Sequence, residues 1–240
     1  MKNLKEKLVL ALDVPNLNEA KKLIQELAEY VGVFKVGKEL FTAVGPEIFK
    51  VIKENGGKIF ADLKYHDIPN TVASAARVLT RQGVEIFNIH ATGGREMIRQ
   101  TREAIEDEAN KLGIKRPKLL AVTVLTSLDN KDLKDLKINV ENTGDYVLHL
   151  AKMAKESGVD GIVCSPLEIE KIKKELGNDF ITLTPGIRPS WASKGDQKRV
   201  MTPKEATKKG GDYIVIGRPI RNAENRVEAT KKILEEMGEE

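Results

Sequence analysis

Short apolar runs rich in β-branched residues recur along the chain, separated by longer segments in which apolar residues follow a helical spacing. The runs predict strands at Leu8–Leu12, Val31–Val36, Lys58–Leu63, Val84–Ile89, Leu119–Val124, Gly161–Cys164, Phe180–Leu183 and Tyr213–Ile216. Between them, apolar side chains return every three or four positions, as they do from Leu17 to Leu27 and from Val147 to Ala154. Such a spacing predicts amphipathic helices with charged outer faces.

Strands that alternate with helices indicate parallel βαβ units, with continuous apolar strands covered on both faces. An open doubly wound sheet and a closed barrel both satisfy this alternation. Eight strands within 240 residues favour the closed form, because about 250 residues is the usual size of a (β/α)8 barrel. No Pro/Ser-rich linker or low-complexity tract divides the chain, so we predict a single (β/α)8 TIM barrel domain spanning residues 1–240.

In such barrels the chemistry lies at the carboxyl ends of the strands and in the loops that follow them. Polar residues of this chain fall at those positions: Asp13, Lys35, Asp62, Lys64, Thr126, Ser127, Arg188 and Arg218. The loop from Gly186 to Thr202 is long and polar, which is typical of an active-site lid.

The third predicted strand carries the densest group of charges, within Asp62-Leu-Lys64-Tyr-His-Asp67. Residues two apart on a strand share a face, so Asp62 and Lys64 are expected to point together into the barrel. Buried charges must be paired or functional. With Lys35 from the neighbouring strand and Asp67 reaching back, we predict an alternating Lys35–Asp62–Lys64–Asp67 array.

Structural explanations for these charges stay open on the residues alone. Asp62 and Lys64 also fit a purely structural ion pair. Asp67 precedes Pro69 and a helical pattern, so it also fits a helix cap. Thr126 and Ser127 fit either turn hydrogen bonding or a substrate contact.

Two further segments predict a phosphate site: Thr184-Pro-Gly-Ile-Arg188 and Ile216-Gly217-Arg218. The loops after the seventh and eighth strands of these barrels often bind phosphate together. Gly217 lets backbone N–H groups approach phosphate oxygens, and the Arg218 guanidinium offers a bidentate fork. We therefore expect a phosphorylated small molecule rather than a polymer.

Composition excludes several other classes. The chain has 40 basic and 36 acidic residues spread along its length and only 5% aromatic residues, which argues against a nucleic-acid interface. Its longest apolar run is far shorter than the ~20 residues of a membrane-spanning helix, and no secretory signal is visible. Cys164 has no second cysteine to pair with, so a reducing cytoplasm is the expected location.

The whole chain resembles the orotidine 5'-phosphate decarboxylase family. The resemblance rests on the segments Ala11-Leu-Asp13, Phe34-Lys35-Val-Gly37, Asp62-Leu-Lys64-Tyr-His-Asp67-Ile-Pro-Asn-Thr71, Val122-Thr-Val-Leu-Thr126-Ser127, Thr184-Pro-Gly-Ile-Arg188 and Ile216-Gly-Arg218. It implies cofactor-free and metal-free decarboxylation of orotidine 5'-phosphate to UMP, the last step of pyrimidine synthesis.

The resemblance also implies residue roles. Lys64 donates a proton to C6 of the pyrimidine, Asp62 lies beside the substrate carboxylate, and Lys35 and Asp13 hold the ribose region. Asp67 and Thr71 belong to the site of a neighbouring subunit, so a homodimer with shared sites is implied. The remaining implied contacts are Thr126 and Ser127 to the pyrimidine, and Arg188, Gln197, Gly217 and Arg218 to the phosphate, with Gln197 on the loop after the seventh strand.

Two alternatives remain. Metal-dependent phosphosugar decarboxylases and aldolases of the same barrel type share residues like Asp62 and Asp67, but they hold a divalent metal with an acidic residue at the end of the second strand. Here that position is Lys35, and an ammonium cannot ligate a cation that needs oxygen donors. The other alternative is a non-catalytic nucleotide-phosphate binder, which the fold alone does not dismiss.

Overall fold

A closed barrel of eight parallel strands forms the centre of the protein in a computed structural model, which describes residues 2–192 and 200–238. The strands are β1 (Leu8–Ala11), β2 (Val33–Val36), β3 (Lys58–Tyr65), β4 (Ile86–His90), β5 (Lys118–Val122), β6 (Gly161–Val163), β7 (Ile181–Thr184) and β8 (Tyr213–Ile216). Each strand pairs with the next, and β8 closes the barrel on β1 through pairs such as Val9 with Val215. The predicted (β/α)8 barrel is confirmed.

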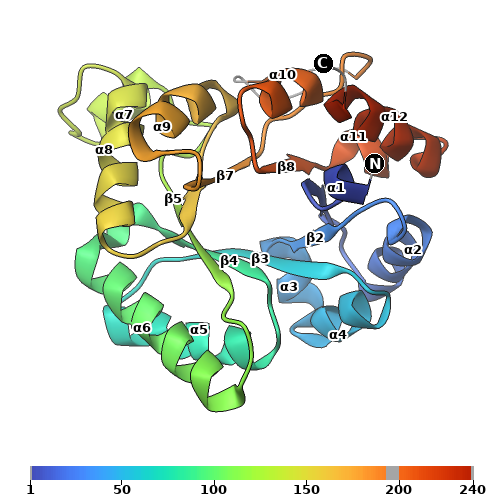
Figure 1. Cartoon of the computed structure of the whole chain (residues 1–240), viewed down its shortest axis with the longest axis horizontal. Helices are drawn as coiled ribbons and strands as arrows, with labels where there is room; N and C mark the ends of the chain where they lie inside the picture. The colour runs from blue at the N-terminus through green and yellow to red at the C-terminus, as the bar shows by residue number, and fades with distance from the viewer. Residues whose placement is uncertain (1, 193–199, 239–240) are drawn as a thin grey trace.

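Helices form a ring outside the strands (Figure 1). The α-helices are α1 (Lys2–Lys5), α2 (Leu17–Leu27), α3 (Lys38–Val44), α4 (Glu47–Glu54), α5 (Pro69–Arg81), α6 (Gly94–Leu112), α7 (Asn130–Asp135), α8 (Thr143–Glu156), α9 (Ile169–Leu176), α10 (Pro203–Lys208), α11 (Arg218–Arg221) and α12 (Arg226–Gly238), with short 3-10 turns η1 (Ala91–Gly93) and η2 (Pro166–Glu168). Among the described residues, no helix is long and apolar enough to span a membrane.

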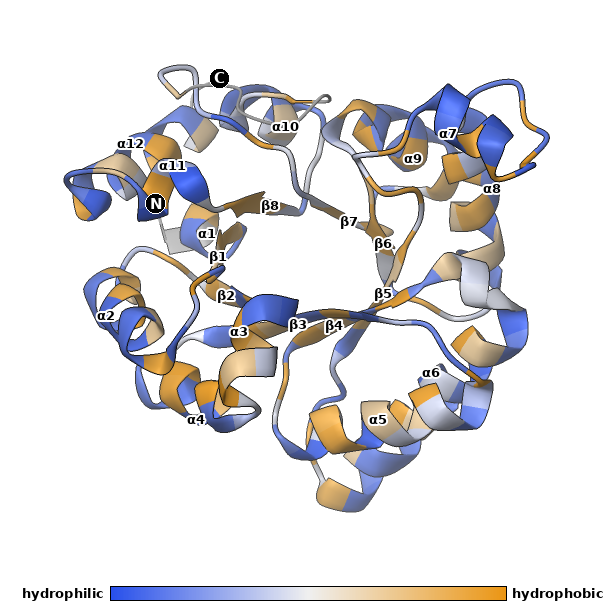
Figure 2. Ribbon diagram, turned by 180° about the vertical axis from the view of Figure 1, so that it is seen from behind, coloured by the Kyte–Doolittle hydropathy of each residue, from blue (hydrophilic) through white to orange (hydrophobic). Residues whose placement is uncertain are grey.

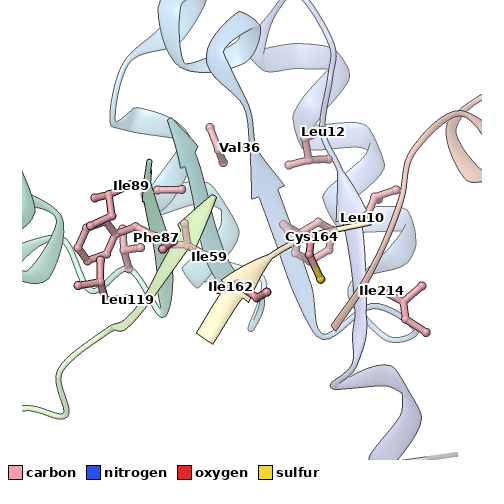
Figure 3. Packing of buried hydrophobic residues seen from close by; sticks show 14 of the residues in the cluster. Leu10, Leu12, Val36, Ile59, Phe87, Ile89, Leu119, Ile162, Cys164 and Ile214 are labelled. Carbon is pink, nitrogen blue, oxygen red and sulfur yellow. The ribbon is translucent and has the colours of Figure 1, made fainter. Parts of the chain in front are cut away.

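Alternation along each strand divides the apolar side chains into two cores. Outward positions such as Leu10, Phe87 and Leu119 pack beneath the helices, as Figure 3 shows. The strands are mostly orange in Figure 2, whereas the helices carry both colours, as expected for amphipathic segments around a buried sheet. Inward positions fill the barrel itself with Val9, Ala11, Val33, Phe60, Ile86, Leu120, Val122, Val163, Leu183 and Val215.

Toward the carboxyl ends of the strands, the inward-facing side chains change from apolar to polar. Two residues beyond the apolar layer, the same faces of β2, β3 and β4 present Lys35, Asp62 and Asn88. Asn88 is fully buried and Lys35 is 8% exposed. The apolar layer is therefore the floor on which a polar group of residues stands.

A second polar group braces the opposite end of the barrel. Asp160 accepts hydrogen bonds from Arg116 at 2.6 and 2.7 Å and from the backbone N–H of Leu119 at 2.8 Å. Arg102 of α6 lies 3.3 Å away on the same carboxylate. Burial raises the pKa of Asp160, but the hydrogen bonds and the arginine charges outweigh it and lower the pKa overall.

We expect Asp160→Asn to destabilise the fold by about 2–3 kcal/mol at neutral pH, because Arg116 loses its charged acceptor in a partly buried site. The pKa of Asp160 is lower in the folded protein than in the unfolded one. Its charge therefore contributes fully to the free energy of unfolding above the ordinary aspartate pKa, and this contribution is lost as pH falls below about 4. Denaturant unfolding of both proteins at pH 7 and pH 3.5 measures it. As a control, Asp145→Asn removes the half-exposed pair with Lys171 and should change stability far less, because solvent screens such surface pairs. An equal cost for Asp160→Asn at both pH values would contradict the charge-based explanation.

Candidate active site

Four charged side chains at the carboxyl ends of β1, β2 and β3 form one alternating array. Lys35 Nζ lies 2.8 Å from Asp13 Oδ1 and 3.4 Å from Asp62 Oδ2. Lys64 Nζ lies 2.5 Å from Asp62 Oδ1. The array therefore runs Asp13–Lys35–Asp62–Lys64, with the Asp62 carboxylate held between two ammonium groups.

Asp62 is the most confined carboxylate of the array, with a side chain that is 13% exposed. Burial raises its pKa, but the positive charges of Lys35 and Lys64 and the hydrogen bonds from Lys64 and Asn88 lower it overall. Asp62 is therefore an anion at neutral pH, and it presents a fixed negative charge to whatever enters the barrel mouth.

Lys64 reaches this position through an unusual backbone. Its φ is 54°, in the left-handed region that residues other than glycine rarely adopt. The β3–β4 register shifts between Ala61 and Tyr65, which places the irregularity around Lys64. Strain of this kind persists only where the surroundings impose it, and it is common at functional sites.

We expect Lys64→Gly to be more stable than Lys64→Ala by about 1 kcal/mol, because glycine alone adopts this conformation without strain. Lys137, in the turn after α7, has a φ of 57° and supplies the matched pair Lys137→Gly and Lys137→Ala away from the array. Thermal or denaturant unfolding of the four variants measures the difference. A stability gain at residue 137 without one at residue 64 would contradict the strained backbone at Lys64.

Gly37 makes room for the pair formed by Lys35 and Asp13. A Cβ atom at this position would lie 2.9 Å from Lys35 Nζ and 3.1 Å from Asp13 Oδ1. Any side chain would therefore push the ion pair apart. Gly37 also precedes α3 with an extended backbone (φ −86°) that any residue adopts, so only its missing side chain matters to the site.

A cavity of about 190 Å³ opens beside the array. Lys35, Asp62 and Lys64 form one charged wall, and most of the remaining surface is apolar. The other lining residues are Phe60, Val122, Val124, Leu125, Thr126, Val163, Cys164, Leu183, Pro185 and Val215. This combination suits a flat, weakly polar ring with a charged substituent on one edge.

A second cavity adjoins the first and shares Lys35, Asp62, Pro185 and Val215 with it. Its far side contains three arginines, Arg188, Arg218 and Arg221. Arg188 is 8% exposed and follows β7, whereas Arg218 and Arg221 belong to α11 after β8. A Cβ atom at Gly217 would lie 3.3 Å from the Ala11 Cβ, so glycine keeps this corner open. The predicted pairing of the seventh and eighth loops is thus present.

Several predicted residues lie elsewhere. Asp67 does not join the array within this chain: it is exposed, and its Oδ1 accepts a hydrogen bond from the Ile68 N–H at 2.6 Å. It does not cap α5 either, because that helix has no side-chain cap. Within this chain, the second carboxylate that the Lys35 ammonium reaches is Asp13, and the place of Asp67 in a partner's site stays a prediction. Thr71 is exposed on the first turn of α5.

Of the residues predicted to contact the pyrimidine or to lie on the loop after the seventh strand, only some are found at the cavities. Thr126 lines the first cavity, whereas Ser127 is exposed and is not among the described residues that line it. Gln197 lies outside the residues that the structure describes. The predicted lid is described only at its two ends, where Ile187 and Met201 form a parallel bridge.

Two polar residues of the site were not predicted. Asn88 of β4 donates from Nδ2 to Asp62 Oδ1 at 2.7 Å and accepts from the Lys64 backbone N–H at 2.8 Å. Arg221 donates to the Asp13 carbonyl at 2.5 Å and so connects the arginine corner to the start of the array. The sequence signal for Asn88 was available: it is the only polar residue within the apolar run Ile86–Ile89.

Together, the fold and this site define an enzyme-type (β/α)8 barrel, with its charged residues at the carboxyl ends of the strands. The chain belongs to the Orotidine 5'-phosphate decarboxylase / HUMPS family, whose sequence model matches residues 6–233.

The chain is similar over nearly its full length to proteins named orotidine 5'-phosphate decarboxylase. It is 50% identical to the one from Syntrophomonas wolfei, with 98% of both chains covered. The solved structure of the Lactobacillus acidophilus enzyme is 39% identical, with a TM-score of 0.85 over 97% of this chain and 99% of that one. The Methanocaldococcus jannaschii enzyme, solved with the inhibitor BMP, is 27% identical, with a TM-score of 0.74 over 97% of this chain and 99% of that one.

Proposed function

We propose that the chain decarboxylates orotidine 5'-phosphate to UMP and CO2 without a metal or an organic cofactor. The observation that carries this proposal is the Asp62–Lys64 pair, at 2.5 Å, on the wall of an apolar cavity that continues into an arginine corner. A ring in the first cavity and a phosphate in the second place the linking ribose beside Asp13 and Lys35. The substrate of this reaction has those three parts in that order.

Substrate binding follows from the two cavities. Arg188 and Arg218 hold the phosphate through charge-assisted hydrogen bonds, with Gly217 allowing close approach, and the resemblance adds Gln197 as a further phosphate contact. Thr126 contacts the pyrimidine, which packs on the apolar lining, whereas Ser127 does not line this cavity and is left without a role in ring binding. Binding energy from the remote phosphate serves to hold the reacting carboxylate against the array.

The substrate carboxylate at C6 then faces Asp62. Two like charges about 4 Å apart repel by on the order of 4 kcal/mol at an effective dielectric of 20. Repulsion of that size accounts for at most about three factors of ten in rate. A further and larger contribution must therefore come from stabilising the transition state.

Lys64 supplies that contribution. The bond between C6 and the carboxylate breaks, its electron pair stays on C6, and CO2 leaves. The Lys64 ammonium stabilises the developing negative charge and transfers one proton to C6, which gives UMP and a neutral amine that takes a proton from water. Lys35 balances Asp62 and Asp13, so that Asp62 stays ionised throughout.

Lys35 also supports this reaction over its metal-dependent alternative. Its ammonium lies between two carboxylates at the end of β2, where the phosphosugar enzymes are expected to have an acidic ligand. The positive charge that a divalent cation would bring is already supplied by the protein, and an ammonium repels such a cation.

The substrate preference tests this proposal directly. Purified protein is incubated with orotidine 5'-phosphate or with a keto-sugar phosphate plus Mg²⁺, and CO2 release is measured. We expect release from orotidine 5'-phosphate only. Turnover of the sugar phosphate alone would assign the chain to the metal-dependent alternative, and UMP affinity without any turnover would assign it to the binder class.

We further propose a homodimer whose sites are shared, with Asp67 and Thr71 serving the partner subunit's site. Both residues are exposed at the start of α5, beside Ile68, which is 70% exposed. Because both polar side chains are exposed, they are accessible to a partner subunit, as the resemblance implies. The interspersed charges give no support for a nucleic-acid partner, and the single buried cysteine is consistent with the cytoplasm.

Subunit mixing tests the shared site. In a mixture of inactive Lys64→Ala and Asp67→Ala proteins, a hybrid dimer regains one complete site, so exchange is expected to restore roughly a quarter of the wild-type activity. A mixture of Lys64→Ala and Asp62→Ala is the matched control, because both residues come from the same subunit and no complete site forms. Failure to regain activity after confirmed subunit exchange would contradict the shared site.

A further inference from the structure

Asn88 is buried directly beneath the charged array. It lies on β4 two residues after Ile86, whose side chain belongs to the apolar floor of the barrel, and it is fully shielded from solvent. A carboxamide in such a place is costly unless its donors and acceptor find partners. Both ends of the Asn88 side chain do, and both partners belong to the Asp62–Lys64 pair.

The oxygen end holds the backbone of Lys64. In a regular parallel ladder, alternate N–H groups of β3 would pair with the β4 backbone. Here, however, four steps along β3 from Ala61 to Tyr65 match only two steps along β4 from Phe87 to Ile89. Lys64, at a φ of 54°, lies within this shift. Its N–H instead donates to Asn88 Oδ1 at 2.8 Å. The side chain thus replaces a backbone acceptor where the chain is strained.

The nitrogen end holds the carboxylate of Asp62. Nδ2 donates at 2.7 Å to Oδ1, the same oxygen that the Lys64 ammonium contacts. The other oxygen, Oδ2, faces Lys35. Because the Lys64 N–H can only donate, it fixes which end of the carboxamide is oxygen, and the NH2 group must then point at Asp62.

We infer that Asn88 is a positioning residue for the decarboxylation: one carboxamide fixes the Asp62 carboxylate and the Lys64 backbone as a single unit. The inference rests on the proposed function. Asn88 acts through these two residues and not on the substrate, since it is not among the described residues that line either cavity.

The choice of asparagine follows from this double role. Aspartate has the same shape and keeps the acceptor for the Lys64 N–H, but it replaces the donor with a second carboxylate next to Asp62. Serine is too short to reach both partners. Positioning errors of about 1 Å at a reacting centre cost on the order of 10²-fold in rate. Both substitutions should therefore impair the chemical step more than they impair binding.

Two variants, Asn88→Asp and Asn88→Ser, test the inference with orotidine 5'-phosphate as substrate and UMP as the binding probe. We expect kcat to fall at least about 30-fold in both, as for the loss of a hydrogen bond to a charged group. KM and the Kd for UMP should change less than about threefold, because the phosphate corner is untouched.

Thr182→Val is the matched control. Thr182 is also fully buried on a barrel strand, and its hydroxyl lies 3.2 Å from Asp212 at the end of the barrel away from the array. Its loss should lower the unfolding temperature while leaving kcat within about twofold of wild type.

Two results would overturn the inference: a folded Asn88→Ser protein with kcat within threefold of wild type, or a parallel loss of UMP affinity that assigns Asn88 to the binding pocket. Wild-type protein without any turnover would instead refute the proposed function. The two failures are therefore distinguishable.

Discussion

Lys64→Ala is expected to lower kcat for orotidine 5'-phosphate at least about 10⁴-fold, because in the proposed mechanism one substitution removes both the proton donor and the charge that stabilises the carbanion. UMP should still bind, since the proposed phosphate site in the arginine corner is unchanged. Single-turnover measurements with excess enzyme, alongside titration with UMP, separate the two effects.

Lys64→Arg separates the positive charge of residue 64 from its ability to donate a proton. Arginine keeps a positive charge beside Asp62 but does not give up a proton at neutral pH. It should therefore bind UMP and still fail to turn over. A rate for either variant within about a hundredfold of wild type would contradict the role of Lys64 as the proton donor.

Arg218→Ala is expected to lower kcat/KM roughly 10²- to 10³-fold, equivalent to about 3–4 kcal/mol of transition-state stabilisation, because the variant lacks the proposed charge-assisted contact to the phosphate. Arg188→Ala should behave similarly, since Arg188 lines the same cavity. Steady-state kinetics over a range of substrate concentrations measures both.

Arg95→Ala is the matched control for these variants. Its guanidinium pairs with Glu156 on the surface, where both side chains are about 60% exposed. It should leave kcat/KM unchanged. A loss of less than tenfold in Arg218→Ala would contradict the assignment of this corner to phosphate.

The barrel could be predicted from the sequence because its signal is repeated. Each strand is a short apolar run, each helix has one apolar face, and eight such units fill 240 residues. The predicted bounds lie within about two residues of the observed ones, the scatter expected at element ends. Position along the strands also predicted which polar residues meet at the barrel mouth, because carboxyl ends of parallel strands share one end of the barrel.

Local backbone conformation could not be predicted in the same way. The third strand extends to Tyr65 rather than ending at Leu63, and Lys64 takes a left-handed φ that nothing about lysine favours. That conformation is imposed by neighbours, among them Asn88, whose contribution appears only once β4 lies beside β3. The contact between Asp13 and Lys35 was not predicted, because the two residues are 22 positions apart in the sequence and only the fold brings them together.

Contacts between subunits also cannot be predicted from the pattern of strands and helices in one chain. The role of Asp67 in a partner's site rests on family resemblance and on its exposure beside Ile68. Arg221 was not predicted because the phosphate motif Gly217-Arg218 lies at the start of α11. The hydrogen bond to the Asp13 carbonyl comes instead from Arg221, the last residue of that helix.

Loss of the ultraviolet absorbance of orotidine 5'-phosphate, followed with and without EDTA, tests the central claim most directly. A protein that uses Lys64 and Asp62 without a metal should consume the substrate at the same rate in both samples and form UMP. Absence of any decay by folded, dimeric protein, or decay that EDTA abolishes and Mg²⁺ restores, would contradict metal-free decarboxylation by this array.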